Sequence, residues 1–181
     1  MRILAATTAA VILASPLAAQ PLSPSRTGPV IDRYGPVYEV ATRGFATPRD
    51  REYRVVFEVS TAPEAVDQIN PSIESLARFL NMHAQAGVPP ANLHLALVLH
   101  GGSGKYALTD GAYQARYGVP NPNGGLLRAL HEVGVRVILC GQTAAHRGFP
   151  VTELAEPIEL ALSAMTALVM LQADGYQLIA F

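Results

Sequence analysis

The fold is decided by the stretch Val135-Arg136-Val137-Ile138-Leu139-Cys140-Gly141-Gln142-Thr143, in which an apolar strand runs directly into the start of a helix. Continuous β-branched and apolar residues are typical of a strand buried on both faces of a parallel sheet. In such sheets, ligands and reacting groups gather at the carboxyl ends of the strands. A thiol beside a helix amino terminus also favours the thiolate, its nucleophilic form. Cys140 is therefore the best candidate in the chain for chemistry.

Strand and helix signals alternate on both sides of this stretch. Apolar runs predict strands at 54–59, 93–100, 135–139, 158–160 and 176–181. Capping residues and helical spacing predict helices that start at Pro71, span 106–117, follow the cap Asn121-Pro122-Asn123, span 143–147 and follow Ser163. This alternation predicts an α/β fold, with a mostly parallel five-stranded sheet between helix layers.

Composition excludes several classes of protein. With 181 residues, of which 50% are hydrophobic and 15% charged, the chain has room for one well-buried domain. The net charge is −1 and no basic run appears, which argues against nucleic acid as a partner. The five histidines lack the close pairing with cysteine or carboxylate that a metal site requires. Neither a metal nor a cofactor is therefore predicted.

The chain before Tyr53 divides into two segments. Residues 1–20 combine Arg2, a short apolar run and small residues near Ala19, a pattern typical of a secretory signal peptide. Export to the periplasm follows, with no membrane segment after cleavage; a retained anchor is the alternative. Residues 21–52 form an extended arm rich in proline, which either packs on something such as a neighbouring subunit or serves as a linker. The domain itself is predicted at 53–181.

Export makes the single cysteine informative. An oxidising compartment favours disulfides, yet one cysteine can form none within its own chain. Cys140 is therefore buried and inert, paired between chains as a redox sensor, or kept as a reactive thiol. Position alone does not separate burial from reactivity, because free cysteine also behaves as a small hydrophobe.

Two polar residues are candidates to assist the thiol. His100 ends its strand as Cys140 ends the next, so both are expected at one edge of the sheet. A neutral imidazole there could accept the thiol proton, although a simple hydrogen-bonded histidine is the alternative. Gln142 has no evident structural duty and could donate a hydrogen bond to the sulfur or to a ligand. His100, Gln142 and Cys140 form the predicted catalytic set.

The predicted ligand-binding residues come from glycine-rich and amide positions. The loop 101–105 lacks the spacing of a phosphate-binding P-loop and of a nucleophile elbow. It is either a plain turn or a loop that turns backbone N–H groups and a lysine toward an anion. Asn123 is first a helix cap, and its amide could also face the thiol. The candidate ligand-binding residues are Gly101, Gly102, Lys105, Asn123 and Gly141.

At these residues the chain resembles the DsrE/DsrF-like family. The segments that carry the resemblance are His100-Gly101, Asn121-Pro122-Asn123, Cys140-Gly141-Gln142, Arg147-Gly148 and the ending Leu171-Gln172-Ala173-Asp174-Gly175-Tyr176. The resemblance covers 53–181. It implies a three-layer α/β/α fold, and Cys140 falls at the position of the family's cysteine. It also implies assembly into homo-oligomers, as trimers or hexamers, and sulfur carriage as a cysteine persulfide in some members.

Two functions follow as expectations. The first is an exported sulfur-handling protein that carries sulfane sulfur on Cys140 and exchanges it with a donor or acceptor protein. The second is a non-catalytic oligomeric module that binds a small ligand or a protein, with Cys140 as a buried structural residue.

Overall fold

The computed structural model of the protein describes residues 24–181, so the signal peptide predicted at 1–20 lies outside the described residues. Five parallel strands form one sheet in this part of the chain, in the order β4-β3-β2-β1-β5. The strands are β1 (Tyr53–Val59), β2 (Leu93–Leu99), β3 (Arg136–Cys140), β4 (Glu159–Ala161) and β5 (Gln177–Ala180). The helices are α1 (Pro71–Gln85), α2 (Asp110–Tyr117), α3 (Gly124–Glu132), α4 (Gly141–Arg147) and α5 (Ala164–Ala173). Short 3₁₀ turns lie at Pro90–Asn92, Ser103–Ala107 and Val151–Glu153.

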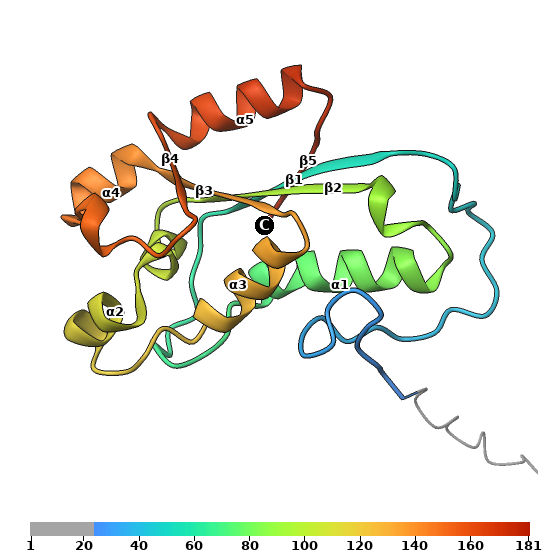
Figure 1. The fold of residues 1–181 in the computed structure, drawn as a ribbon, viewed down its shortest axis with the longest axis horizontal. Coiled ribbons are helices and arrows are strands. Elements are labelled where there is room, and N and C mark those ends of the chain that lie inside the picture. Colours follow the sequence, from blue (N-terminus) through green and yellow to red (C-terminus); the bar gives the residue numbers. More distant parts are fainter. Residues whose placement is uncertain (1–23) are drawn as a thin grey trace, which may run out of the picture.

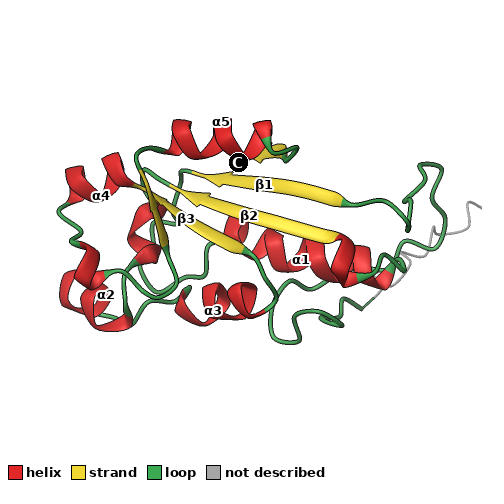
Figure 2. Ribbon diagram, turned by 45° about the horizontal axis from the view of Figure 1, so that its top comes forward, coloured by secondary structure: helices red, strands yellow, loops and turns green. Residues whose placement is uncertain are grey.

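The order of the strands explains the two helix layers. From β1 to β4 the chain always steps toward the same edge of the sheet, and right-handed crossovers then place the connecting helices on one face. The last crossover runs back across the sheet to β5, so the same handedness places α5 on the opposite face. Figures 1 and 2 show α1 and α3 below the sheet and α5 above it. The connection that follows β3 and the connection that follows β4 therefore leave toward opposite faces of the sheet. Cys140, the last residue of β3, lies where the two connections diverge.

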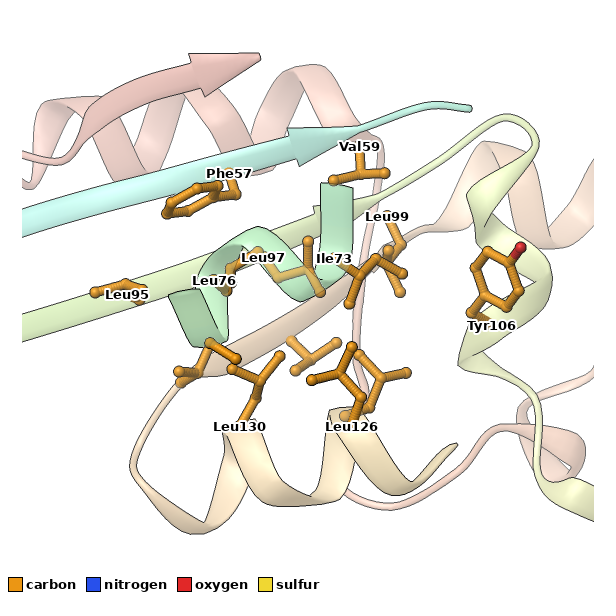
Figure 3. Packing of buried hydrophobic residues seen from close by; sticks show 14 of the residues in the cluster. Phe57, Val59, Ile73, Leu76, Leu95, Leu97, Leu99, Tyr106, Leu126 and Leu130 are labelled. Atoms are coloured by element: carbon orange, nitrogen blue, oxygen red, sulfur yellow. The ribbon is translucent and has the colours of Figure 1, made fainter. Parts of the chain in front are cut away.

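Two hydrophobic clusters fill the space between the layers. The larger cluster joins the lower face of the sheet to α1 and α3, and its side chains interdigitate as Figure 3 shows for Phe57, Leu97, Ile73, Leu126 and Leu130. Burying each such side chain stabilises the fold by about 1.5–3 kcal/mol. The smaller cluster joins the upper face to α5 and includes Val56, Val98, Ile138 and Cys140. The thiol thus belongs to the α5 layer.

The arm packs on the domain of its own chain. Ile31 and Val37 are buried, and Asn81 of α1, which is 0% exposed, holds the arm through hydrogen bonds. Its Oδ1 accepts from the N–H groups of Val30 and Ile31, and its Nδ2 donates to the carbonyls of Ile31, Tyr34 and Gly35. Residues 24–37 are therefore docked on α1 of the same chain, whereas Tyr38, Val40 and Phe45 beyond them are exposed.

Several predicted boundaries move by a few residues. Residues 106–117 do not form one helix: a 3₁₀ turn ends at Ala107, and α2 begins after Thr109, whose side chain accepts a hydrogen bond from the N–H of Ala112. Helix α4 begins at Gly141, directly after the strand, rather than at Thr143. In the part of the chain that the structure describes, no helix is long and apolar enough to cross a membrane.

Candidate functional site

Cys140 lies between the starts of two helices. It is the last residue of β3 and the N-cap of α4, and it pairs in register with Ala161 of β4. The chain turns from β4 into α5 at Ser163, whose hydroxyl caps that helix by accepting from the N–H of Thr166. Cys140 packs against Ala164, the first residue of α5, and is 6% exposed. The thiol therefore faces the amino ends of α4 and α5 together.

Hydrogen bonds from these helix starts outweigh the effect of burial on the thiol. Burial alone would raise the pKa of Cys140, because it penalises the charged thiolate. The N–H and hydroxyl of Thr143, and the N–H groups of Ala164 and Gln142, donate to the sulfur and lower that pKa below its ordinary value. The net shift is downward, so the folded protein holds more thiolate at neutral pH than an unstructured cysteine peptide does.

Thr143 connects the thiol to the loop after β2. Its Oγ1 accepts a hydrogen bond of 3.1 Å from the N–H of Gly101, which leaves the hydroxyl proton directed at the sulfur. Since Thr143 lies in the first turn of α4, the same residue fixes the helix start, the loop and the thiolate.

Replacing Thr143 with valine is expected to slow alkylation of Cys140 at neutral pH. The change removes the hydroxyl donor, and a hydrogen bond to a charged group contributes about 1.5–3 kcal/mol. The thiolate fraction falls, but a more basic thiolate is intrinsically more nucleophilic. We therefore expect the alkylation rate to fall by roughly threefold to tenfold. Stopped alkylation assays read by intact mass measure this rate. Thr143→Ser keeps the hydroxyl and should stay close to wild type; equal rates for the valine and serine variants would contradict the assignment.

His100 lies beside Cys140 on the neighbouring strand. Leu99 of β2 pairs with Leu139 of β3, so the next positions, His100 and Cys140, are adjacent. The strand spacing is about 4.8 Å in a sheet of this kind. The imidazole Nε2 of His100 is hydrogen-bonded to the carboxylate of Glu58 of β1. The structure thus brings His100, Cys140 and a carboxylate to the same edge of the sheet.

The backbone N–H groups of Gly101 and Gly102 donate hydrogen bonds to other residues of the chain. The N–H of Gly101 goes to Thr143, and the N–H of Gly102 donates to the carbonyl of Ser60 at 2.7 Å. A Cβ at Gly101, whose φ is +53°, would lie 2.9 Å from that same carbonyl oxygen. The close approach of the two backbones explains glycine here. The loop braces α4 against β1, and these two N–H groups are not directed at a ligand.

Lys105 lies on the other side of the sheet from the thiol. Its ammonium is 5.2 Å from the ring centroid of Tyr106 and 5.4 Å from that of Tyr117, both of which pack in the larger cluster. Lys105 is 8% exposed, and burial together with the charge of Arg147 lowers its pKa. Among residues 24–181 no carboxylate pairs with it. Aromatic faces hold this cation, away from Cys140.

The remaining candidates serve the backbone around the site. Asn123 is the N-cap of α3, as predicted, but its side chain makes no capping hydrogen bond: Oδ1 accepts instead from the N–H of Asn70 at 3.0 Å. That bond ties the starts of α1 and α3 together in the lower layer. The amide of Gln142 donates to the carbonyl of Leu162 at 3.3 Å, so its backbone N–H, not its side chain, reaches the sulfur.

Gly141 sits where the backbone after the thiol passes closest to the next connection. A Cβ at this position would lie 2.5 Å from the carbonyl oxygen of Ala161 and 3.2 Å from that of Leu162. Only glycine lets α4 start so close to the chain that leads from β4 into α5.

Three parts of the site around Cys140 are not predicted as functional from the sequence. The sequence predicts Thr143 only as part of a helix, the start of α5 only as a capped helix, and Glu58 only as part of a strand. Glu58 did carry a signal, because a carboxylate near the end of the apolar run 54–59 has to find a partner when buried. The approach of α5 to Cys140 depends on the strand order, which no local pattern encodes.

Comparisons with known proteins agree with this fold. A model of the DsrE/DsrF-like family matches residues 53–181. The chain is similar in structure to a protein of unknown function, MTH1491 from Methanobacterium thermoautotrophicum, at a TM-score of 0.54 and 18% identity over 72% of this chain and 100% of that one. It is also similar to the ychN protein from E. coli, at a TM-score of 0.52 and 20% identity over 71% of this chain and 99% of that one. No curated protein sequence matches the chain.

At these identities the two structures establish the fold alone, and they confirm the predicted α/β class with its five-stranded parallel sheet. Among the described residues, no group of three or more histidine, cysteine or acidic side chains could hold a metal ion.

Proposed function

Because the chain belongs to the DsrE/DsrF-like family, we propose that the protein carries sulfane sulfur as a persulfide on Cys140. The family is generally linked to sulfur relay. The observation that carries the proposal is the set of N–H and hydroxyl donors that surround the sulfur of Cys140 and lower its pKa against the effect of burial. Donors from α4 and α5 converge on one sulfur, which is the arrangement expected for a cysteine that reacts as a thiolate.

The transfer needs only a thiolate and a donor with a terminal sulfur. The Cys140 thiolate attacks the sulfane sulfur of a persulfide donor, a new S–S bond forms to Cys140, and the S–S bond of the donor breaks. The donor leaves as a thiolate with the electron pair of that bond, so charge and oxidation state balance without a further reductant. A donor that enters as a persulfide anion keeps its own negative charge on the transferred sulfur, which becomes the outer sulfur of Cys140, near the same N–H donors.

We place this chemistry in the periplasm, on the strength of the signal-peptide pattern at 1–20. A single cysteine suits that compartment, because it cannot be lost to a disulfide within its own chain.

We further propose that the protein forms a homo-oligomer through α5. The segment 161–173 contains no charged residue, and its outward side chains include Leu162 at 74% and Met165 at 76% exposure. Exposed apolar surface of this extent is typical of a protein contact. The segment also borders Cys140, so a donor or acceptor protein would approach beside it.

Replacing Met165 with lysine is expected to lower the solution mass of the assembly. A charge at the centre of an apolar contact costs several kcal/mol of association free energy unless it finds a partner. Light scattering of the purified protein measures the mass directly. Met82→Lys is the matched control, because Met82 is an exposed methionine on α1, under the opposite face of the sheet. A wild-type protein with the mass of a single chain would contradict the proposal.

Release of the carried sulfur to cyanide tests the function itself. After loading with polysulfide and removal of excess donor, cyanide takes the outer sulfur as thiocyanate and restores the Cys140 thiolate. We expect about one thiocyanate per folded chain, because Cys140 is the only cysteine. A loaded protein that yields no thiocyanate would contradict sulfur carriage.

The small exposure of Cys140 supports a second candidate, a binding module in which the thiol is structural. Labelling with a thiol reagent separates the two. A structural thiol reacts only after denaturation, whereas the proposed carrier reacts in the native state.

A further inference from the structure

A carboxylate and an imidazole lie on the same face of the sheet as the thiol. Val56 of β1 and Cys140 of β3 both belong to the cluster under α5, and side chains alternate along a strand. Glu58, two residues after Val56, therefore faces α5 as well. Its carboxylate reaches across to Nε2 of His100, which follows β2. The three strand ends, β1, β2 and β3, present Glu58, His100 and Cys140 in that order.

The pairing with Glu58 decides which nitrogen of His100 carries the proton. A carboxylate only accepts hydrogen bonds, so the bond requires a proton on Nε2. In the neutral ring, Nδ1 is then an acceptor. His100 and Cys140 follow paired positions on neighbouring strands. An acceptor nitrogen on such a neighbour could take the proton of the thiol, and a carboxylate bonded to the ring would stabilise the resulting imidazolium.

We propose that Glu58 is a positioning residue, which holds His100 with Nδ1 free to take the proton of Cys140. This inference rests on the proposed sulfur carriage. Before attack, the proton moves from Sγ to Nδ1 and the ring becomes an imidazolium paired with Glu58. When the donor departs as a thiolate, His100 returns that proton to it, and the pair is restored.

Few other charges act on this pair from the surrounding elements. Helix α5 above it carries no charged residue, and β3 contributes Cys140 as its titratable group at this edge. On α4, His146 and Arg147 are exposed and lie in the last turn, away from the helix start. Lys105 is held on the other side of the sheet by Tyr106 and Tyr117. Glu58 is thus the charged group directly bonded to His100.

Alkylation of Cys140 across a range of pH, in wild type and in Glu58→Gln, tests the role of Glu58. General base assistance is worth about 10²–10⁴-fold, and the N–H donors already supply part of the activation here, so we expect a loss of about tenfold at neutral pH. The pH at which the rate is half-maximal should also move upward, whereas a merely structural role would leave the profile in place. Glu58→Asp keeps the charge and should recover part of the rate. Superimposable wild-type and Glu58→Gln profiles would overturn the inference.

The tautomer of His100 gives a test that needs no variant of Glu58. Nitrogen NMR of the wild-type protein, with the His100 signals assigned through His100→Gln, shows which ring nitrogen bears the proton. A protonated Nε2 and an unprotonated Nδ1 are expected, and the reverse would overturn the inference.

If sulfur uptake is intact and Glu58→Gln matches wild type, the positioning role fails while sulfur carriage stands. If wild type takes up no sulfur, sulfur carriage fails whatever the tautomer is.

Discussion

Cys140→Ser is expected to abolish sulfur uptake by the folded protein. Cys140 is the only cysteine, so no other thiolate can form the persulfide. A serine hydroxyl stays protonated at neutral pH, and the N–H donors at the helix starts cannot turn it into a comparable nucleophile. We expect complete loss of the added sulfur mass after incubation with polysulfide.

The fold should tolerate this substitution, which makes the loss interpretable. The side chains are close in size, and the donors of Thr143 and Ala164 that served the sulfur can serve a hydroxyl oxygen. We expect the free energy of unfolding to change by no more than about 1–2 kcal/mol. Chemical denaturation measures it. Undiminished sulfur uptake in the serine variant would show that Cys140 is not the carrier.

Gly141→Ala is expected to damage both the site and the stability of the fold. The new Cβ would lie 2.5 Å from the carbonyl oxygen of Ala161. This oxygen belongs to the backbone of β4, so it cannot move aside as a flexible side chain could. The start of α4 must then move from the start of α5, which withdraws the N–H of Ala164 from the sulfur. Overpacking typically costs about 1–3 kcal/mol, and loss of a donor raises the pKa of Cys140.

The expected readouts are a lower free energy of unfolding and slower alkylation of Cys140 at neutral pH. Gly111→Ala is the matched control. Gly111 lies in α2 with nothing within 4 Å of an added Cβ, and alanine in a helix stabilises by about 0.5–1 kcal/mol relative to glycine. A Gly141→Ala variant with wild-type stability and reactivity would contradict the packing of the two helix starts around the thiol.

Local signals in the sequence predicted the elements better than their contacts. The apolar run before Cys140 and the pair Asn70-Pro71 define β3 and the start of α1 correctly, because strand burial and helix capping depend on neighbouring residues. The region 106–117 was misjudged, since the cap of α2 is Thr109 and the residues before it form a 3₁₀ turn. Asn123 occupies its capping position but bonds to Asn70, a partner 53 residues away.

The site shows the same contrast between local features, which the sequence predicts, and long-range contacts, which it does not. The position of Cys140 at a strand end was readable from the sequence, as was the adjacency of His100, because both depend on where strands stop. The convergence of α5 on the thiol was not readable, because it requires β4 to be next to β3 and the chain to return over the opposite face. The pairing of Glu58 with His100 likewise requires β1 and β2 to be neighbours in a fixed register.

Intact-mass spectrometry of the native protein after exposure to polysulfide tests the central claim, that Cys140 is an activated thiolate in the folded state. Sulfur carriage on Cys140 requires a gain of sulfur mass on the folded wild-type chain, its removal by a reductant, and no gain on Cys140→Ser. A folded protein that gains no mass, while the same protein gains it after unfolding, would contradict sulfur carriage and make the thiol structural.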